Sequence, residues 1–212
     1  MILQVPIKSA KYFGWQHVLK DLGDFQKCIS QRFGESPDYY AWLNIDGHNG
    51  LDIPYDDGTE VFASHDGTVE FVGQDSSAGK GVVIKAQGYK TIYWHLKEFR
   101  VKIGDRVKMG DLIGLGDNTG FSTAPHLHFG LKLLDDNGQV LNRDNGFDGA
   151  IDPLPFITWF VQDMTTEQVH KLYASWHLND PQGEAYWVGK PLDALLKARL
   201  EDGIKTFTEA LS

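Results

Sequence analysis

The chain is poor in cysteine and has no long hydrophobic run. Cys28 is the only cysteine among 212 residues, so no disulfide can form within the chain, and cysteine usage leaves the redox compartment open. No motif surrounds Cys28, and we expect a packing residue rather than a nucleophile. No stretch approaches the roughly 20 apolar residues needed to cross a bilayer. We therefore predict no membrane span.

The N-terminus also lacks the features of an export signal. Residues Met1 to Lys8 contain no basic segment, and their apolar run is too short for a signal peptide. We expect either that the chain is not exported by the Sec route as written or that a leader has been removed.

An excess of basic residues is missing as well. The chain has 20 Lys and Arg residues against 29 Asp and Glu residues, which gives a formal net charge of −9. This charge argues against nucleic acid or an acidic membrane as the main partner. The hydrophobic share of 42% is typical of a soluble globular protein, and the length suits one well-buried domain with a small appendage.

Short apolar runs and glycine turns fill the middle of the chain. Runs such as Thr68–Val72 and Gly81–Lys85 alternate with turn signals such as Asp66-Gly67 and Asn137-Gly138. This pattern predicts a mainly β, antiparallel domain, which we place at residues 31–156. Residues 1–30 are predicted to be an N-terminal extension with one amphipathic helical turn, Trp15–Leu22.

The sequence pattern becomes helical after Pro155. Thr165 and Gln168 form a capping box, and Pro191 opens a second run with apolar residues at helical spacing. We predict a small α-helical C-terminal module over residues 157–212. Two or three helices can hardly build a large core alone, so we expect these helices to dock on the β domain or on a protein partner.

The most informative stretch is His126-Leu127-His128-Phe129. Its polar–apolar alternation predicts a strand, and a strand sends residues i and i+2 to the same face. His126 and His128 should therefore project side by side. Two such imidazoles can bind a metal, or one can bind metal while the other handles protons. Taken alone, the pair is equally well read as a polar strand face.

A second polar group lies upstream, in Gly47-His48-Asn49-Gly50-Leu51-Asp52. Asn49-Gly50 is a turn signal that can fold His48 back beside Asp52. One histidine from the downstream strand would complete a set of two nitrogens and one oxygen, which is typical of a catalytic zinc site with its fourth position open. His95 ends an apolar β run between these segments, and we take it as structural unless the fold brings it to the same cleft.

Three motifs in order carry a resemblance to a known family. They are Gly-His-x-Gly-x-Asp at residues 47–52, Tyr-x-His-Leu at 93–96 and Asn-Thr-Gly-x-Ser-x-x-Pro-His-Leu-His-Phe at 118–129. Together they resemble the LytM/lysostaphin-type zinc metallopeptidases, which have a duplicated hybrid motif β fold, over roughly residues 31–156. The resemblance implies an endopeptidase that hydrolyses peptide cross-links in bacterial peptidoglycan and acts on the cell wall, in an extracellular, periplasmic or virion-associated location.

The same resemblance implies a role for each matching residue. His48, Asp52 and His128 match the protein ligands of one Zn²⁺ per chain. His95 and His126 match the two histidines that serve proton transfer and transition-state stabilisation. His65 falls on a family position without a catalytic role. Tyr39, Tyr40, Trp42 and Phe121 are either walls of the substrate groove or ordinary packing residues.

Two alternatives to an active enzyme follow from the same motifs. One is a LytM-like domain that binds and activates another wall hydrolase, and the other is a structural module of a phage virion that makes its protein contacts through the C-terminal helices. Relatives of the first kind have lost metal ligands or catalytic histidines, whereas all five matching positions are occupied here. The missing signal peptide favours a phage-encoded lysin or virion hydrolase.

Overall fold

The computed structural model describes residues 1–158. Residues 2–158 belong to one compact unit, so residues 2–30 pack in the same unit as the β domain. The boundaries of the three predicted domains stay predictions, and the predicted C-terminal helices lie outside the described residues. Among the described residues, no helix has the length and apolar character needed to cross a membrane.

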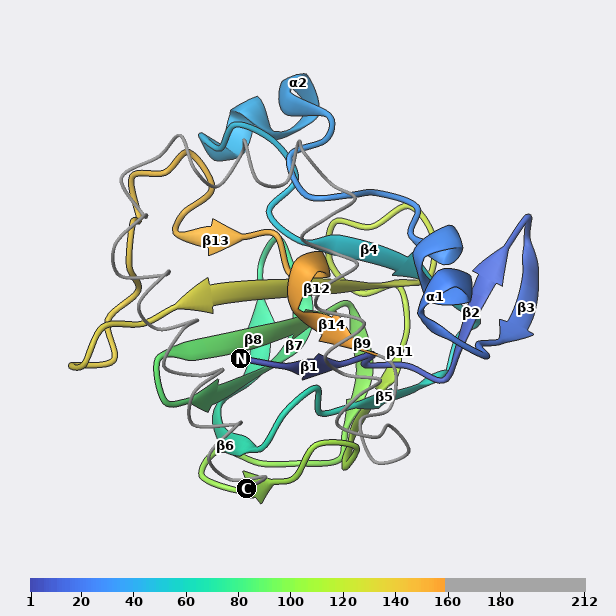
Figure 1. The fold of residues 1–212 in the computed structure, drawn as a ribbon. Helices are drawn as coiled ribbons and strands as arrows, with labels where there is room; N and C mark the ends of the chain where they lie inside the picture. Colours follow the sequence, from blue (N-terminus) through green and yellow to red (C-terminus); the bar gives the residue numbers. More distant parts are fainter. Residues whose placement is uncertain (159–212) are drawn as a thin grey trace. The chain divides into compact units, whose positions relative to one another are not determined.

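Strands dominate the described chain, which confirms the prediction of a mainly β protein (Figure 1). The helices are α1 (Leu22–Cys28), α2 (Pro37–Tyr40) and the 3₁₀ turns Ala41–Leu43 and Leu154–Phe156. The first strands are β1 (Leu3–Gln4), β2 (Ser9–Tyr12), β3 (Trp15–Val18), β4 (Leu51–Pro54), β5 (Glu60–Phe62), β6 (Gly67–Asp75) and β7 (Gly79–Ala86). The later strands are β8 (Tyr89–Trp94), β9 (Leu96–Phe99), β10 (Arg106–Val107), β11 (Leu112–Gly116), β12 (His126–Leu133), β13 (Ala150–Ile151) and β14 (Ile157–Thr158).

A seven-stranded sheet is the centre of the fold. Its strands follow the order β10-β6-β7-β8-β12, and both β4 and β13 pair with the remaining edge of β12. Residues His126–Phe129 of β12 pair with β4, and Leu131 and Lys132 pair with β13. All these pairings are antiparallel, so β12 lies between β4 and β8 at its first half.

The two faces of this sheet differ in character because side chains alternate along each strand. On one face, Leu127, Phe129 and Leu131 of β12 are buried in the core with Tyr93 of β8 and Ile84 of β7. A second sheet of order β5-β11-β9 also contributes buried side chains to the core. The other face of β12 carries His126 and His128, so the polar–apolar alternation of this strand separates core from site.

The N-terminal segment departs from the sequence prediction. Residues Trp15–Val18 form a strand paired with Ser9–Tyr12, and α1 begins only at Leu22, so the predicted helical turn at Trp15–Leu22 is wrong. The chain reverses at Phe13 and Gly14, which have φ values of +49° and +81°. Positive φ at both central residues is the geometry of a two-residue β-hairpin turn.

Candidate metal centre

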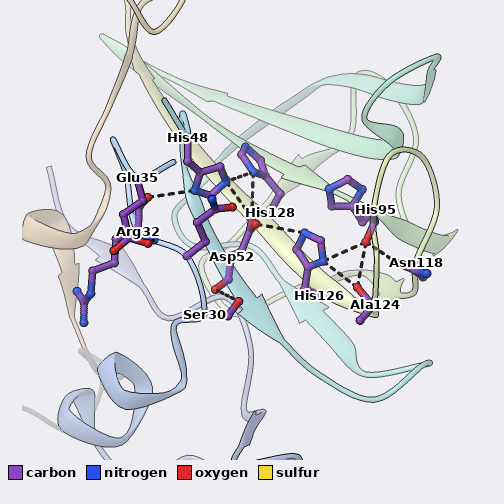
Figure 2. Close-up of polar contacts among 12 residues, drawn as sticks. Ser30, Arg32, Glu35, His48, Asp52, His95, Asn118, Ala124, His126 and His128 are labelled. Atoms are coloured by element: carbon purple, nitrogen blue, oxygen red, sulfur yellow. Dashed lines mark hydrogen bonds and ion pairs between the residues drawn. The ribbon is translucent and has the colours of Figure 1, made fainter. Parts of the chain in front are cut away.

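Three side chains converge at the paired ends of β4 and β12 (Figure 2). Asp52 lies opposite His128 in the strand register, and His48 lies in the turn before β4. The Nε2 atom of His48 is 2.9 Å from Nδ1 of His128 and 3.0 Å from Oδ1 of Asp52. Nδ1 of His128 is 3.1 Å from the same carboxylate oxygen. The structure thus brings the three residues predicted as metal ligands into one triangle of donor atoms.

A turn with a glycine makes this approach sterically feasible. The backbone N–H of His48 donates to the carbonyl of Glu35 at 2.9 Å, which fixes the start of the turn. A Cβ atom on Gly50 would lie 2.7 Å from Cε1 of His128, closer than any side chain allows. The His128 ring therefore occupies the space that glycine leaves open beside the turn.

Hydrogen bonds and burial set the protonation of the triangle. Nδ1 of His48 donates to the carbonyl of Arg32 at 3.3 Å, which leaves Nε2 as an acceptor directed at Asp52. Burial alone would raise the pKa of Asp52, but His128 and His48, when a proton on the facing ring nitrogen lets them donate to the carboxylate, outweigh burial and hold that pKa far below its usual range. Burial lowers the pKa of His128. An ionised carboxylate and neutral imidazoles are the forms that bind metals.

The donor set fits a tetrahedral metal ion. Ligands about 2.0–2.1 Å from a tetrahedral zinc lie about 3.3–3.4 Å from one another, and the three donor atoms here are separated by 2.9 to 3.1 Å. They are acceptor-type atoms with few protons to share, so a cation is the species that would satisfy all of them together. His, His and Asp are also ligands that zinc prefers.

Two further histidines lie beside the triangle. Nε2 of His126 is 3.4 Å from Oδ2 of Asp52, and the rings of His95 and His126 are 4.5 Å apart between centroids. His126 donates from Nδ1 to the carbonyl of Ala124 at 2.8 Å, and His95 donates from Nδ1 to the carbonyl of Thr119 at 2.7 Å. Each ring therefore has Nε2 left as a proton acceptor. The structure brings all five predicted site residues into one cleft.

His95 occupies an unusual backbone position. Its φ is +66°, in the left-handed region that few residues other than glycine adopt. Burial and the neighbouring His126 lower its pKa to about 4, so the imidazole is neutral at neutral pH. A strained residue with a perturbed pKa in a cleft is typical of a functional site.

The loop at residues 117–125 positions both of these histidines through the carbonyls of Thr119 and Ala124, a role that the sequence did not predict. Thr119 also donates from Oγ1 to the carbonyl of Leu96 at 2.8 Å, and accepts from the backbone N–H of Lys80 at 3.1 Å. Gly79 and Gly120 touch: a Cβ atom on Gly120 would lie 2.3 Å from the nitrogen of Gly79. The signal in the sequence is the Asn-Thr-Gly motif itself, because a glycine after a β-branched residue indicates a tight turn.

The site opens into a cleft of about 780 Å³. Tyr39, Tyr40, Trp42 and Phe121 line it, as the groove prediction requires. The Phe121 ring contacts Tyr39 and Trp42, with ring centroids 5.8 and 5.6 Å apart. Aromatic rings from two separate loops thus meet over one side of the cleft.

Comparisons with known proteins agree with this geometry. Residues 46–143 match the model of Peptidase family M23. The chain is 37% identical over 128 residues to the glycyl-glycine endopeptidase ALE-1 of Staphylococcus capitis, covering 59% of this chain and 33% of the relative. It is 45% identical over 104 residues to the peptidoglycan DD-endopeptidase ShyA of Vibrio cholerae, covering 49% of this chain and 24% of the relative.

A solved structure is similar as well. The catalytic domain of the antimicrobial peptidase lysostaphin from Staphylococcus simulans superimposes with a TM-score of 0.51 and 30% sequence identity. The match covers 64% of this chain and 93% of that domain. The chain therefore corresponds to nearly the whole of one peptidase domain, whereas it spans only a third or less of the two full-length relatives.

Proposed function

Because the chain belongs to peptidase family M23, a family of metallopeptidases, we propose that it is a zinc-dependent endopeptidase that hydrolyses peptide cross-links in bacterial peptidoglycan. The observation that carries this proposal is the convergence of His48, Asp52 and His128 beside His95 and His126. The relatives named above are endopeptidases of glycyl-glycine bonds and of peptidoglycan. Such an enzyme acts at the cell wall, outside the cytoplasmic membrane.

His48, Asp52 and His128 would hold the zinc. When bound there, zinc polarises a carbonyl oxygen and lowers the pKa of a bound water from about 15.7 to about 7. A zinc held by these three residues would still accept water or substrate as a further ligand, as catalytic rather than structural zinc does.

His126 and His95 supply the proton chemistry. Each ring is fixed by a hydrogen bond from Nδ1 to a backbone carbonyl, so each presents Nε2 as a general base. We assign proton abstraction from the attacking water to His126, whose Nε2 lies 3.4 Å from Asp52. The protonated ring then donates the proton to the leaving amine nitrogen. His95, adjacent to His126, presents Nε2 as an acceptor that orients the attacking water.

A clearing assay with a chelator arm tests the proposal. Purified peptidoglycan of several wall types is treated with the wild type and with His126→Ala, each with and without chelator, and metal content is measured in parallel. We expect clearing by the wild type that chelator abolishes. The His126→Ala variant should retain one zinc per chain and lose about 10²–10⁴-fold in rate, the usual contribution of general acid–base catalysis.

The other outcomes separate the alternative functions. Bound zinc without clearing of any wall type would support a binding, activating or virion-structural role. A folded chain that binds no zinc would overturn the metalloenzyme proposal.

A further inference from the structure

The open face of the central sheet has three rows of side chains, which run across adjacent strands. Strand register places His128 beside Trp94 in the first row and Gly130 beside Ile92 in the second. The third row consists of lysines: Lys132 of β12 pairs with Lys90 of β8, which pairs in turn with Lys85 of β7. Each row is two residues further along its strands, so all three rows share the face that carries the metal centre.

The lysine row, defined as Lys85, Lys90 and Lys132, is unfavourable for stability. Side chains directly opposite each other on adjacent strands lie about 5 Å apart at Cβ, and like charges at such positions destabilise a sheet. The side chains of Lys90 and Lys132 are only 21% and 13% exposed, so solvent screens them incompletely. Positions that cost stability without a packing benefit are often functional.

Internal counter-ions do not balance this end of the cleft. Glu70 is shared by Lys85 at 3.4 Å and Lys90 at 2.9 Å, and Asp148 pairs with Lys132 at 2.6 Å. Arg143 lines the same end of the cleft and has no ion pair or hydrogen bond within residues 1–158. The three cationic groups that line the cleft here, Lys90, Lys132 and Arg143, thus have only Asp148 and a carboxylate of Glu70 that Lys85 also uses, in a chain whose formal net charge is −9. This local excess favours an anionic group of the substrate.

The distance to the metal centre suits a peptide. Lys132 follows His128 by four residues on β12, which at about 3.3 Å per residue places the lysine row about 13 Å from the metal ligands. An extended peptide covers this distance in about four residues. Between the two rows lie Gly130, Ile92 and Val83, so the floor there is apolar and has no side chain on β12.

We propose that Lys90, Lys132 and Arg143, which line the cleft, bind a free carboxylate of the substrate peptide, three to four residues from the bond that is cleaved. This inference rests on the proposed peptidase function and narrows its substrate. It selects cross-linked stem peptides that carry an acidic residue at this distance, and it disfavours bridges built only of uncharged residues such as glycine. Lysine and arginine recognise carboxylates through charge-assisted hydrogen bonds.

Two matched peptides test the inference with the zinc-loaded full chain. Both contain the same cleavable cross-link, and they differ only in a carboxylate or a carboxamide at the fourth residue from the cleaved bond. We expect kcat/KM to be about tenfold higher for the carboxylate peptide, the effect of one or two charge-assisted hydrogen bonds. The preference should decrease at high salt, because salt screens the attraction between the carboxylate and these partly exposed cations.

Variants of the lysine row then assign the preference to these residues. Lys90→Gln with Lys132→Gln should reduce the ratio of the two kcat/KM values to about one, and Lys132→Arg should retain it. Lys108→Gln removes one positive charge from an ion pair with Asp66, at residues outside the strands and outside the cleft, so its ratio should match the wild type. Thermal melting verifies that each variant is folded. If the double variant is not folded, the single Lys132→Gln variant replaces it in the comparison.

Failure of this inference is distinct from failure of the proposed function. Equal cleavage of both peptides by the wild type would overturn the carboxylate site and leave the peptidase in place. If neither peptide is cleaved, calorimetry of the same two peptides on the metal-free chain decides: tighter binding of the carboxylate peptide supports the site, and equal or absent binding overturns it.

Discussion

The molecule contains a histidine pair in the cleft, His48 and His128, and a buried histidine in the core, His65. The two differ in the partners of their ring nitrogens. In the cleft, His48, His128 and Asp52 direct acceptor atoms at one another at about 3 Å. On the core side, His65 has both ring nitrogens engaged: Nδ1 donates to the carbonyl of Asp66 at 2.8 Å, and the Thr91 hydroxyl donates to Nε2 at 2.8 Å. The Thr91 hydroxyl lies 2.9 Å from the Tyr93 hydroxyl, which accepts from the backbone N–H of Ser64.

This difference separates a ligand site from a structural network. The His65 network satisfies its polar atoms within the protein, so nothing further is required to stabilise it. In the triangle, the hydrogen bonds run between the three potential ligand atoms themselves, which is the arrangement that a bound cation would replace. Both places contain a buried histidine, His48 in the cleft and His65 in the core. The orientation of the second ring nitrogen is what distinguishes them.

The largest effect is expected for Asp52→Ala, which removes a ligand and the only anion of the triangle. Outer partners of metal ligands contribute about 10–100-fold to metal affinity, so loss of a ligand should exceed a hundredfold and abolish clearing of peptidoglycan. Zinc per chain and clearing are the measurements. Asp56→Ala, which removes an exposed carboxylate paired with Lys11, should leave both unchanged. One zinc bound per Asp52→Ala chain would contradict the assignment.

A smaller effect is expected for Gly50→Ala, which tests the position of the His128 ring rather than its chemistry. The new Cβ atom would lie 2.7 Å from both Cε1 of His128 and the backbone oxygen of Phe129, so the His128 ring and the adjoining part of β12 must shift, and the triangle with them. We expect zinc affinity, measured by competition with a chromophoric chelator, to fall about 10–100-fold while the protein remains folded. On Gly130 a Cβ atom would meet Ile92 at 3.4 Å, so Gly130→Ala should retain wild-type affinity. Equal affinities for both variants would contradict this explanation.

Disrupting the His65 network in the core should lower the stability of the protein and leave zinc binding unchanged. Thr91→Val keeps the shape of the side chain but leaves Nε2 of the buried His65 without its donor, which costs about 1–3 kcal/mol of unfolding free energy. Urea unfolding measures this loss. Zinc content and clearing should stay at wild-type values because the network faces away from the cleft. A loss of zinc in this variant would show that the two histidine groups are coupled.

Much of the site could be predicted from residue types and local spacing. Alternation in His126-Leu127-His128-Phe129 gives the shared face of the two histidines, and the Asn49-Gly50 turn gives the approach of His48 to Asp52. His95 could not be placed from its own segment. Its position depends on a positive φ and on a carbonyl of the distant residue Thr119, and backbone carbonyls leave no mark in the residue type.

Long-range register accounts for the features that the sequence did not reveal. The lysine row exists only because β7, β8 and β12 align Lys85, Lys90 and Lys132, and three single lysines in alternating strands look like solvated surface residues. The hairpin at Ser9–Val18 was misread as helical for a related reason. Its turn uses Phe13 at positive φ, where Asn, Asp or Gly is the usual signal.

The smallest expected effect that distinguishes the core histidine His65 from the cleft histidines is its contribution to the pH dependence of stability. Burial lowers the pKa of His65 below its usual value of 6.5. Below pH 6.5 the unfolded chain therefore binds a proton that the folded chain does not. The unfolding free energy then decreases as the pH is lowered, by up to about 1.4 kcal/mol per pH unit. We expect His65→Gln to have a shallower slope than the wild type between pH 6.5 and 5.5, in urea unfolding with chelator present. Thr91→Val retains the imidazole and should keep the wild-type slope. An unchanged slope in His65→Gln would show that His65 is protonated to the same extent in the folded and unfolded states.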